Sequence, residues 1–236
     1  SLPLTFNSLD EVDHVRQHMD AALVAGLEAN GFVTFGLADG GFAYIMSNAP
    51  VDRFEALGRV KVWVPANDKM VLDAIKGFGV NPISLPIADV RTGLQTGLID
   101  TVAISPIGAI VLQWHTQVRY LTRLPLVYLF GILALERKAF SRITPTDQAE
   151  VRRIMTRIWR EMDAMNRADN VKALEALRNQ GIEFIEPTRE ARDKWYQRAE
   201  PINRQIIEAG HISPAAIDKL ERLLNDYRAR LARQNQ

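Results

Sequence analysis

Apolar and polar positions change their spacing along the chain in a regular way. Between residues 59 and 64, valines occupy every second position, which predicts a strand that ends at Pro65. A helical spacing follows as far as Gly79, and strand and helix then continue to alternate. Predicted strands cover residues 59–64, 82–86 and 99–105, and predicted helices cover residues 69–78 and 89–96. Short strands separated by single helices are typical of parallel βαβ units, so we expect an α/β sheet here.

The segment before this region combines a helix with two strands. Ser8 and Glu11 form a capping box, which predicts a helix over residues 8–30. Apolar and aromatic runs at residues 32–37 and 42–46 flank an Asp-Gly-Gly sequence, so we expect two strands joined by a turn. Beyond the βαβ region, the apolar run at residues 127–135 predicts a strand that is buried on both faces.

The last third of the chain has a helical pattern. Thr144 is a suitable N-cap before a proline, and the helix that begins there is expected to break near residues 166–170. We interpret its apolar stripe as the face packed on the core. The stripe consists of Ile154, Ile158, Met162 and Met165. The remaining predicted elements are a strand at residues 182–185 and two helices that begin near residues 188 and 213.

Composition excludes several classes of protein. The 236 residues include 29 Lys and Arg against 28 Asp and Glu, so no excess of positive charge attracts nucleic acid or an anionic membrane. The chain has no cysteine, which rules out disulfides, thiol nucleophiles and thiolate metal sites. Its longest apolar runs hold roughly a dozen residues, whereas a membrane-spanning helix needs about 20. We therefore expect a globular protein that has no nucleic-acid partner.

Few combinations of residues indicate catalysis or metal binding. His14 and His18 are four positions apart, a spacing that can hold a metal ion, but the sequence nearby offers no third ligand. Glycine motifs of nucleotide-binding proteins and serine hydrolases are absent from the sequence. We therefore expect no metal, no cofactor and no enzymatic activity. A small-molecule enzyme that uses His115 or a scattered carboxylate stays open as an alternative.

Trp63 is the unusual residue of the predicted sheet. It shares the polar side of its strand with Arg59 and Lys61, and it lies next to the end of that strand. Ligands of α/β proteins bind at strand ends. An indole at this position either lines a pocket or covers a neighbouring helix, and the residues themselves favour neither interpretation.

Several segments, taken in order, resemble one family of binding proteins. Residues 58–65 (GRVKVWVP) and 83–100 (ISLPIADVRTGLQTGLID) are similar to the GxKxRVP strand and the LQxGxxDG-like turn of the solute-binding proteins of tripartite ATP-independent periplasmic (TRAP) transporters. Residues 2–6 (LPLTF) resemble the apolar LPFxF segment of that family. Residues 41–48 resemble its stretch ending in Ser-Asn, and residues 144–148 resemble the start of its long helix. The resemblance extends over the whole chain.

The resemblance implies an α/β fold with two lobes, of the periplasmic-binding-protein type, with long C-terminal helices. In this interpretation residues 1–40 are the remainder of the N-terminal lobe and residues 41–125 form the second α/β lobe. Residues 126–143 form a cross-over strand, and residues 144–236 form the long spanning helix, a return strand and the C-terminal helices. Members of the family begin with a further segment that supplies the first strands of lobe one. We therefore expect the first lobe to be incomplete in this chain.

The resemblance also implies a set of solute-binding positions. The family grips a carboxylate with an arginine of the GxKxRVP strand, and Trp63 stands at that position. Ala43 replaces a second polar contact, and Leu129 falls near the place of a family asparagine. The other candidate positions are Asn67 and Ile87, which match the pocket, and Tyr44 and Tyr128, which are expected nearby. An indole cannot replace a bidentate guanidinium, so the change implies an apolar or aromatic solute, or a cation held on a ring face.

The function implied by the resemblance is transport. The protein would capture a small organic molecule by closure about a hinge and deliver it to the membrane permease subunits of a TRAP transporter. This implies a periplasmic protein whose signal peptide has been removed. The alternatives are a ligand-sensing domain of the same fold without a transporter, and the small-molecule enzyme named above. The sequence leaves the oligomeric state open.

Overall fold

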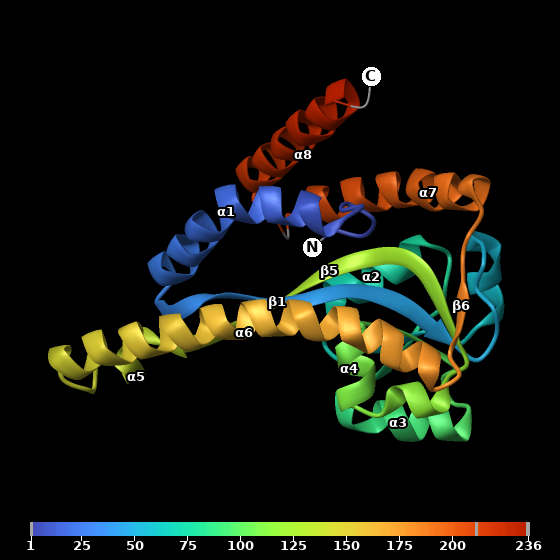
Figure 1. Cartoon of the computed structure of the whole chain (residues 1–236), viewed down its shortest axis with the longest axis horizontal. Coiled ribbons are helices and arrows are strands. Elements are labelled where there is room, and N and C mark those ends of the chain that lie inside the picture. Colours follow the sequence, from blue (N-terminus) through green and yellow to red (C-terminus); the bar gives the residue numbers. More distant parts are fainter. Residues whose placement is uncertain (1, 211, 235–236) are drawn as a thin grey trace.

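The centre of the molecule is a sheet built on two long antiparallel strands. A computed structural model describes residues 2–210 and 212–234; His211, which the sequence predicts near a helix end, lies outside this part. Strand β1 (Phe32–Ser47) pairs with β5 (Tyr120–Glu136) along most of its length. The short strands β4 (Thr101–Ile104) and β6 (Glu183–Ile185) complete the order β4-β1-β5-β6. Figure 1 shows β1 and β5 as a curved ribbon through the middle of the molecule.

A smaller parallel sheet adjoins the first one. Strands β2 (Trp63–Pro65) and β3 (Ile83–Leu85) are parallel and are connected by α2 (Lys69–Gly77). Helix α3 (Ile87–Thr96) then leads from β3 to β4. A parallel bridge between Val62 and Thr101 joins the start of β2 to β4. The predicted βαβ pattern is therefore confirmed, although its strands are shorter than the sequence indicates, and β4 also pairs antiparallel with β1.

Helices surround the central ribbon. Helix α6 (Pro145–Asn179) runs along β1, and α1 (Leu9–Ala29) packs both on β1 and beside α8 (Pro214–Gln234). Helix α7 (Arg189–Glu208) packs against α2. The short helices are α4 (Pro106–Val111), α5 (Arg137–Phe140) and the 3₁₀ helices η1 (Phe54–Arg59) and η2 (Trp114–Gln117). Within the described part of the chain, no helix is long and apolar enough to cross a membrane. The expected α/β class is confirmed.

The helix starts follow the local sequence signals. The Ser8 hydroxyl accepts a hydrogen bond from the Glu11 amide, and the Glu11 carboxylate accepts one from the Asn7 amide. Thr144 and Thr188 cap α6 and α7 in the same way. A side-chain cap stabilises a helix by about 1 kcal/mol because it satisfies amides that have no partner within the helix. These starts were predicted correctly because capping involves residues within one turn.

The expectation of two strands around residues 39–41 is wrong. Strand β1 continues through the Asp-Gly-Gly sequence without a turn. The glycines instead accommodate irregularities in the ladder to β5, with φ of 128° at Gly36 and 77° at Gly41. A side chain at Gly41 would collide with Asn170 of α6, since its Cβ would lie 2.6 Å from Nδ2. The glycines therefore allow a long, bent strand and a close helix.

The expectation that residues 127–135 are buried on both faces is also wrong. Strand β5 alternates, with Tyr128 fully buried while Leu129 and Ile132 are 36% and 47% exposed. One face of the strand is covered by α1, and the other is open along part of its length. The expected boundary between the N-terminal lobe and the second lobe lies after residue 40, and the one between the second lobe and the cross-over strand lies after residue 125. These two boundaries fall inside β1 and β5, so each of these strands continues from one proposed part into the next.

Helix α6 differs from its prediction in two respects. It is continuous through residues 166–170, where Asn166 donates to the Asp39 carbonyl and Asn170 bonds back to Asn166. The predicted core stripe is wrong: none of its four residues belongs to a buried apolar cluster, and Met165 is 55% exposed. The residues packed on the sheet instead are Val151, Met155, Trp159, Ala173 and Leu177. Two apolar stripes fit the helical period, and only the position of β1 selects between them.

Candidate functional site

An apolar cavity of about 270 Å³ lies between α2, α7 and the middle of the central sheet. Strands β1, β4 and β5 contribute its floor, and β2 lies on one side. Helix α2 supplies Met70, Val71, Ala74 and Ile75, its C-cap residue is Phe78, and α7 supplies Trp195 and Ile206. The amphipathic sequence of α2 places these apolar side chains on the face opposite its solvent-exposed lysines. The cavity is a hydrophobic enclosure of a size suited to a small organic molecule.

Polar groups are few on the walls of this cavity. Among the described residues, no Lys, Arg or His lines it, and Asp68 is the one carboxylate. Asp68 caps α2, since its Oδ1 accepts from the Val71 amide at 3.0 Å. The Thr101 hydroxyl donates to Asp100 at 2.9 Å. Both polar side chains therefore already have partners within the protein.

Trp63 belongs both to the cavity wall and to an apolar cluster. The expectation that it lies on a polar face is wrong, because its side chain is only 8% exposed. The ring packs edge to face on Trp114 at a centroid distance of 5.1 Å, and its Nε1–H donates to the Leu85 carbonyl at 3.0 Å. Both interpretations therefore hold in part: the indole packs on neighbouring elements, and Trp63 is one of the residues that line the cavity.

Trp195 is a wall residue that the sequence did not single out. It lies on α7, is 1% exposed, and packs edge to face on Phe54 at 5.4 Å. Its Nε1–H has no hydrogen-bond partner among the described residues. The local sequence offered no signal for this role, because a tryptophan on an amphipathic helix is ordinarily a core residue.

Three of the positions expected from the resemblance meet at this cavity. Ala43 of β1 and Leu129 of β5 line it together with Trp63. Ala43 is buried, and Leu129 lies opposite Gly41 in the strand ladder. Chain segments that are far apart in sequence are thus brought to one wall by the β1–β5 pairing.

The other expected positions lie elsewhere. Tyr44 is adjacent to Ala43 and therefore points to the opposite face of β1, where it borders a small cavity beside Asn170. Asn67 is exposed in a left-handed turn with φ of 68°, and Ile87 is 56% exposed at the start of α3. Tyr128 is buried on the α1 side of the sheet and takes no part in the cavity.

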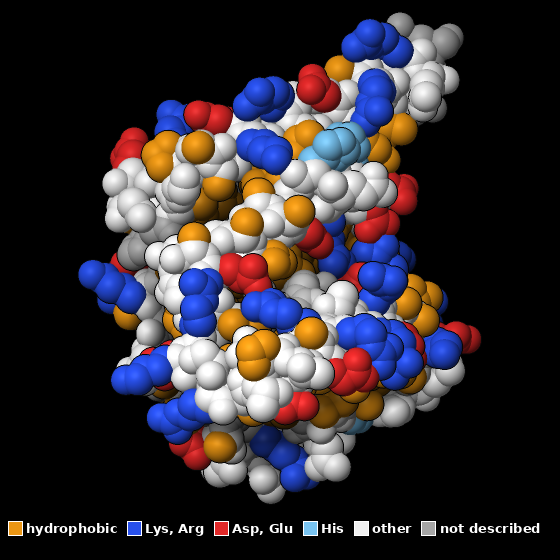
Figure 2. Space-filling model, turned by 90° about the vertical axis from the view of Figure 1, so that its left-hand side faces the viewer, with side chains coloured by type: hydrophobic (Ala, Val, Ile, Leu, Met, Phe, Trp, Pro, Cys, Tyr) orange, Lys and Arg blue, Asp and Glu red, His pale blue; other side chains and the backbone are white. Residues whose placement is uncertain are grey.

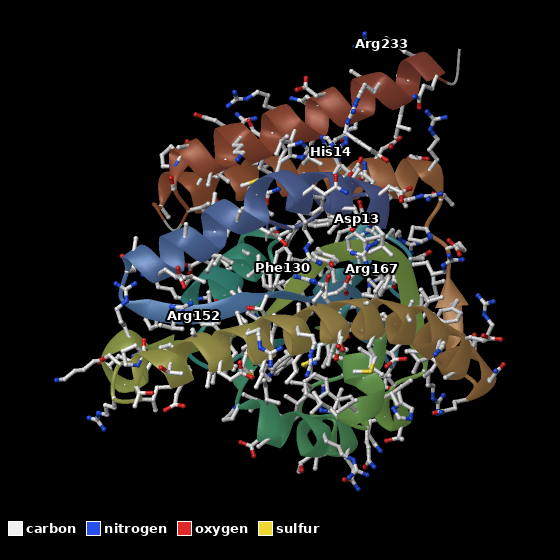
Figure 3. The ribbon with its side chains drawn as sticks, turned by 60° about the vertical axis from the view of Figure 1, so that its left-hand side comes forward. Asp13, His14, Phe130, Arg152, Arg167 and Arg233 are labelled. Carbon is white, nitrogen blue, oxygen red and sulfur yellow. The ribbon has the colours of Figure 1, made fainter. Side chains whose placement is uncertain are left out.

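A charged network occupies the opposite face of β1. Arg167 of α6 contacts Asp13 of α1 at 2.6 Å and Asp39 of β1 at 3.2 Å, and Figure 3 shows Arg167 reaching from α6 towards α1. The Tyr128 hydroxyl donates to Asp39 at 2.5 Å. Burial and this hydrogen bond both raise the pKa of Tyr128, so the phenol keeps its proton. Arg16 of α1 adds a contact to α6 through Asp163 at 2.8 Å. The network ties α1 to α6 across the middle of β1.

The described histidines do not assemble a metal site or a catalytic pair. His14 and His18 are neighbours on α1, with ring centroids 4.8 Å apart, and His14 also stacks on Tyr227. His115 bonds to the Ala109 carbonyl at 3.0 Å. In the described ranges, no three His, Asp or Glu side chains come together in a way that could hold a metal ion.

Comparisons with known proteins place this geometry in context. The family model described as bacterial extracellular solute-binding protein, family 7 (DctP), matches residues 1–209. The protein YiiZ of Salmonella typhimurium is 28% identical over 195 residues, which are 79% of this chain and 58% of that protein. The chain thus spans somewhat more than half the length of this curated relative.

Solved structures share the fold. One is a TRAP periplasmic solute-binding protein from Xanthobacter autotrophicus, solved with bound β-D-galacturonate. Its superposition on this chain has a TM-score of 0.82 at 20% sequence identity, and the aligned residues are 95% of this chain and 73% of that protein. A second TRAP periplasmic solute-binding protein, from Ralstonia eutropha with bound (S)-2-acetolactate, has a TM-score of 0.86 at 17% sequence identity. The aligned residues are again 95% of this chain and 73% of that protein. At these identities the likeness establishes the fold alone.

Proposed function

Since this chain belongs to the bacterial extracellular solute-binding proteins of family 7, we propose that it captures a small organic solute and delivers it to the membrane permease of a TRAP transporter. The solute binds in the cavity between α2, α7 and the central sheet. Ala43, Trp63 and Leu129 contact it, and the protein works in the periplasm. Delivery follows closure of the parts of the chain about a hinge.

The observation that carries this proposal is the cavity itself. Its apolar walls come from separate segments that the fold brings together, and wall residues include Trp63 and Ala43 at the positions where the family grips its solute. Binding sites for small molecules are concave and mostly apolar, with few polar groups. The described wall residues offer one carboxylate and no histidine, so they provide no acid and base for chemistry on the solute. This favours binding without turnover.

Strands β1 and β5 are the proposed hinge. They run through both proposed parts of the chain, and their ladder changes register between Thr34 and Leu37 and again between Asp39 and Gly41. Register irregularities weaken the regular hydrogen bonding that would hold two strands rigid. Helix α6 follows the same path and contacts β1 at Gly36 and Gly41.

The face seen in Figure 2 carries charges of both signs. On the face seen in Figure 2, Lys and Arg side chains are interspersed with Asp and Glu. Recognition of nucleic acid relies on a continuous basic surface that neutralises several phosphates. The face seen in Figure 2 therefore offers no continuous basic surface of this kind.

A binding screen tests the proposal. The Tm of the 236-residue chain is measured in the presence of each member of a panel of charged and uncharged organic solutes. The Kd of every solute that raises the Tm is then measured by calorimetry. A solute at 100 times its Kd stabilises the folded state by about 2.7 kcal/mol, which gives a clear rise in Tm. The solute is then recovered and analysed, and we expect it to be unchanged. Chemical conversion of the solute, or no stabilisation by any member of the panel, contradicts the proposal.

A pair of variants locates the site. Ala43→Leu enlarges a wall residue of the cavity and should weaken binding of a hit by at least about tenfold, because overpacking a filled pocket is unfavourable. Ala134→Leu makes the same change at an exposed position of β5 and should leave the affinity unchanged. Uptake of the hit by cells that contain the permease, with and without this protein, tests delivery.

A further inference from the structure

We propose that Asp39 is a clamped pivot in the middle of the hinge: side chains of α6 hold this residue in place, and β1 bends at the glycines on either side of it. The inference rests on the proposed function, since it concerns the closure that follows solute capture. It assigns a conformational role to Asp163 and Asn166 of α6, which do not line the cavity.

The edge of β1 that faces away from β5 has a neighbouring strand along only part of its length. In the described part of the chain, β4 pairs with β1 from Tyr44 to Ser47. Before Tyr44, backbone groups on this edge need other partners, because a buried N–H or C=O without a partner costs free energy. Asp39 is 1% exposed, so bulk water does not supply these partners.

Helix α6 supplies the partners of Asp39 from its side chains. The Asp39 amide donates to Asp163 Oδ1 at 2.7 Å, and the Asp39 carbonyl accepts from Asn166 Nδ2 at 2.9 Å. Arg167 adds a third contact, because its Nε donates to the Asp39 carboxylate at 3.2 Å. Positions three and four apart share one face of a helix. One face of α6 therefore binds the N–H, the C=O and the side chain of a single strand residue.

Helix α1 reinforces the same edge through Arg16. This guanidinium donates from Nη2 to the Leu37 carbonyl at 3.0 Å and from Nη1 to Asp163 at 2.8 Å. Residues 37–39 face consecutive residues of β5 without an irregularity. The side chains of α1 and α6 thus hold a short regular segment of β1 from its outer edge.

The ladder between β1 and β5 changes register on both sides of this clamped segment. The irregularities lie between Thr34 and Leu37 and between Asp39 and Gly41. Gly36 and Gly41 have φ of 128° and 77°, which glycine adopts without steric cost. Strands bend where their regular ladder is interrupted. The bending of β1 is therefore concentrated at the two glycine sites, while the segment between them stays with α6.

Amide exchange on the unchanged protein, followed by NMR, gives the first test. Ala38 is the internal reference: neighbouring strand residues direct their backbone groups to opposite edges, so its amide faces β5. We expect the Asp39 amide to exchange within about tenfold of the Ala38 rate, because both are held by persistent hydrogen bonds. Faster exchange than this would show that the contact with Asp163 is transient and would overturn the pivot.

Distances between two spin labels test the pivot itself. Since the chain has no cysteine, Lys138→Cys in α5 and Arg91→Cys in α3 provide unique labelling sites. Both positions are exposed, and Figure 1 shows α5 and α3 towards opposite ends of α6, on either side of the clamp. Double electron–electron resonance then gives the distribution of distances between the two parts of the chain without any solute.

Two variants of α6 loosen the clamp in this labelled protein. Asp163→Ala removes the acceptor of the Asp39 amide, and Asn166→Asp removes the donor to the Asp39 carbonyl with almost no change of size. We expect each variant to raise the fraction of molecules with distances outside the parent distribution by at least about threefold, as loss of one hydrogen bond implies. If Asp163→Ala does not fold, Asn166→Asp and the exchange measurement decide.

Two control variants separate the clamp from a general loss of charge. Asp163→Asn keeps an oxygen that accepts from the Asp39 amide, so it should retain the parent distribution. Glu28→Ala removes a different ion pair between α1 and α6, with Arg152 at 2.8 Å, and should retain it as well. The pivot is overturned if both clamp variants keep the parent distribution, or if either control broadens it as much as the clamp variants do.

Failure of the pivot and failure of the proposed function give different results. The label measurements need no solute, so broadening in the clamp variants supports the pivot even if no solute of the panel binds, and the proposed function then fails alone. A solute that binds and shifts the label distance equally in the parent and in both clamp variants supports capture and overturns the pivot.

Discussion

Trp63 and Trp114 lie edge to face, with ring centroids 5.1 Å apart and ring planes at 79°. This pair connects β2 to the 3₁₀ helix η2, and both rings are almost completely buried. Trp63 thus stands at the position where the resemblance implies a solute-gripping arginine, but its surroundings are those of a core residue. A guanidinium placed here would lose its water without gaining a carboxylate from the described neighbours.

We therefore expect Trp63→Arg to destabilise the fold as well as to change solute binding. The free energy of unfolding should fall by about 3 kcal/mol or more, since the change buries an unpaired charge and removes the Trp114 contact. Chemical denaturation measures this loss. Ile87→Arg is the matched control, because residue 87 is 56% exposed and should tolerate the charge within about 0.5 kcal/mol. Equal stability of the two variants would show that Trp63 is not part of the core.

Tyr128→Phe should destabilise the protein through Asp39. The change removes the hydroxyl that donates to the buried Asp39 carboxylate, whose other contact is Arg167. Loss of a hydrogen bond to a buried charged group costs about 1.5–3 kcal/mol. Tyr44→Phe provides the control, since Tyr44 is half-buried and no hydrogen bond of its hydroxyl is found among the described residues. Denaturation curves in which both variants match the wild type would contradict the importance of the network.

The packed face of α6 can be mapped with two aspartates. Leu177 is fully buried against the βαβ region, so Leu177→Asp should cost more than about 4 kcal/mol or prevent folding. Met165 is 55% exposed, and Met165→Asp should change stability by less than about 0.5 kcal/mol. Circular dichroism melts distinguish the two outcomes. If Met165→Asp unfolds the protein, the residues packed on the core are those at 154, 158, 162 and 165, as the sequence pattern predicts.

The contact between α1 and α8 should weaken in acid. Desolvation, followed by the charges of Arg230 and His18, lowers the pKa of His14 below its ordinary value of 6.5. The unfolded chain therefore takes up a proton at this residue before the folded protein does. The contribution of neutral His14 to the free energy of unfolding is therefore fully present above pH 6.5. This contribution is lost as the pH falls from 6.5 through the lower pKa of the folded protein. His14→Gln should flatten the fall in Tm between about pH 7.5 and 5, whereas an unchanged pH profile would exclude His14 as a contributor.

Much of the local structure follows from short stretches of sequence. Ser8, Thr144 and Thr188 begin helices where expected, because a cap involves only residues within one turn. The alternation of short strands and helices between β2 and β4 was predicted for a similar reason, since each period is visible in a few residues. The order of the motifs along the chain also indicates the family, because each motif is a short run of residues.

The candidate site could be predicted only in part. Ala43, Trp63 and Leu129 were expected from the resemblance, and the structure brings them to one cavity. Tyr44 was expected beside them, but the two-residue period of β1 directs it to the other face. Trp195 has no local feature that marks it as a wall residue, because its role depends on where α7 crosses α2.

The sequence by itself determined the class of the fold, the helix starts, the βαβ pattern and the family, because these depend on neighbours in the chain. Only the tertiary structure decided that β1 runs unbroken through Gly40 and Gly41, because partner strands and a close helix determine whether glycines form a turn or a bulge. It also decided which stripe of α6 faces the sheet and that Trp63 is buried. Those outcomes depend on contacts between residues far apart in sequence, and packing selects among several arrangements that the local pattern allows equally.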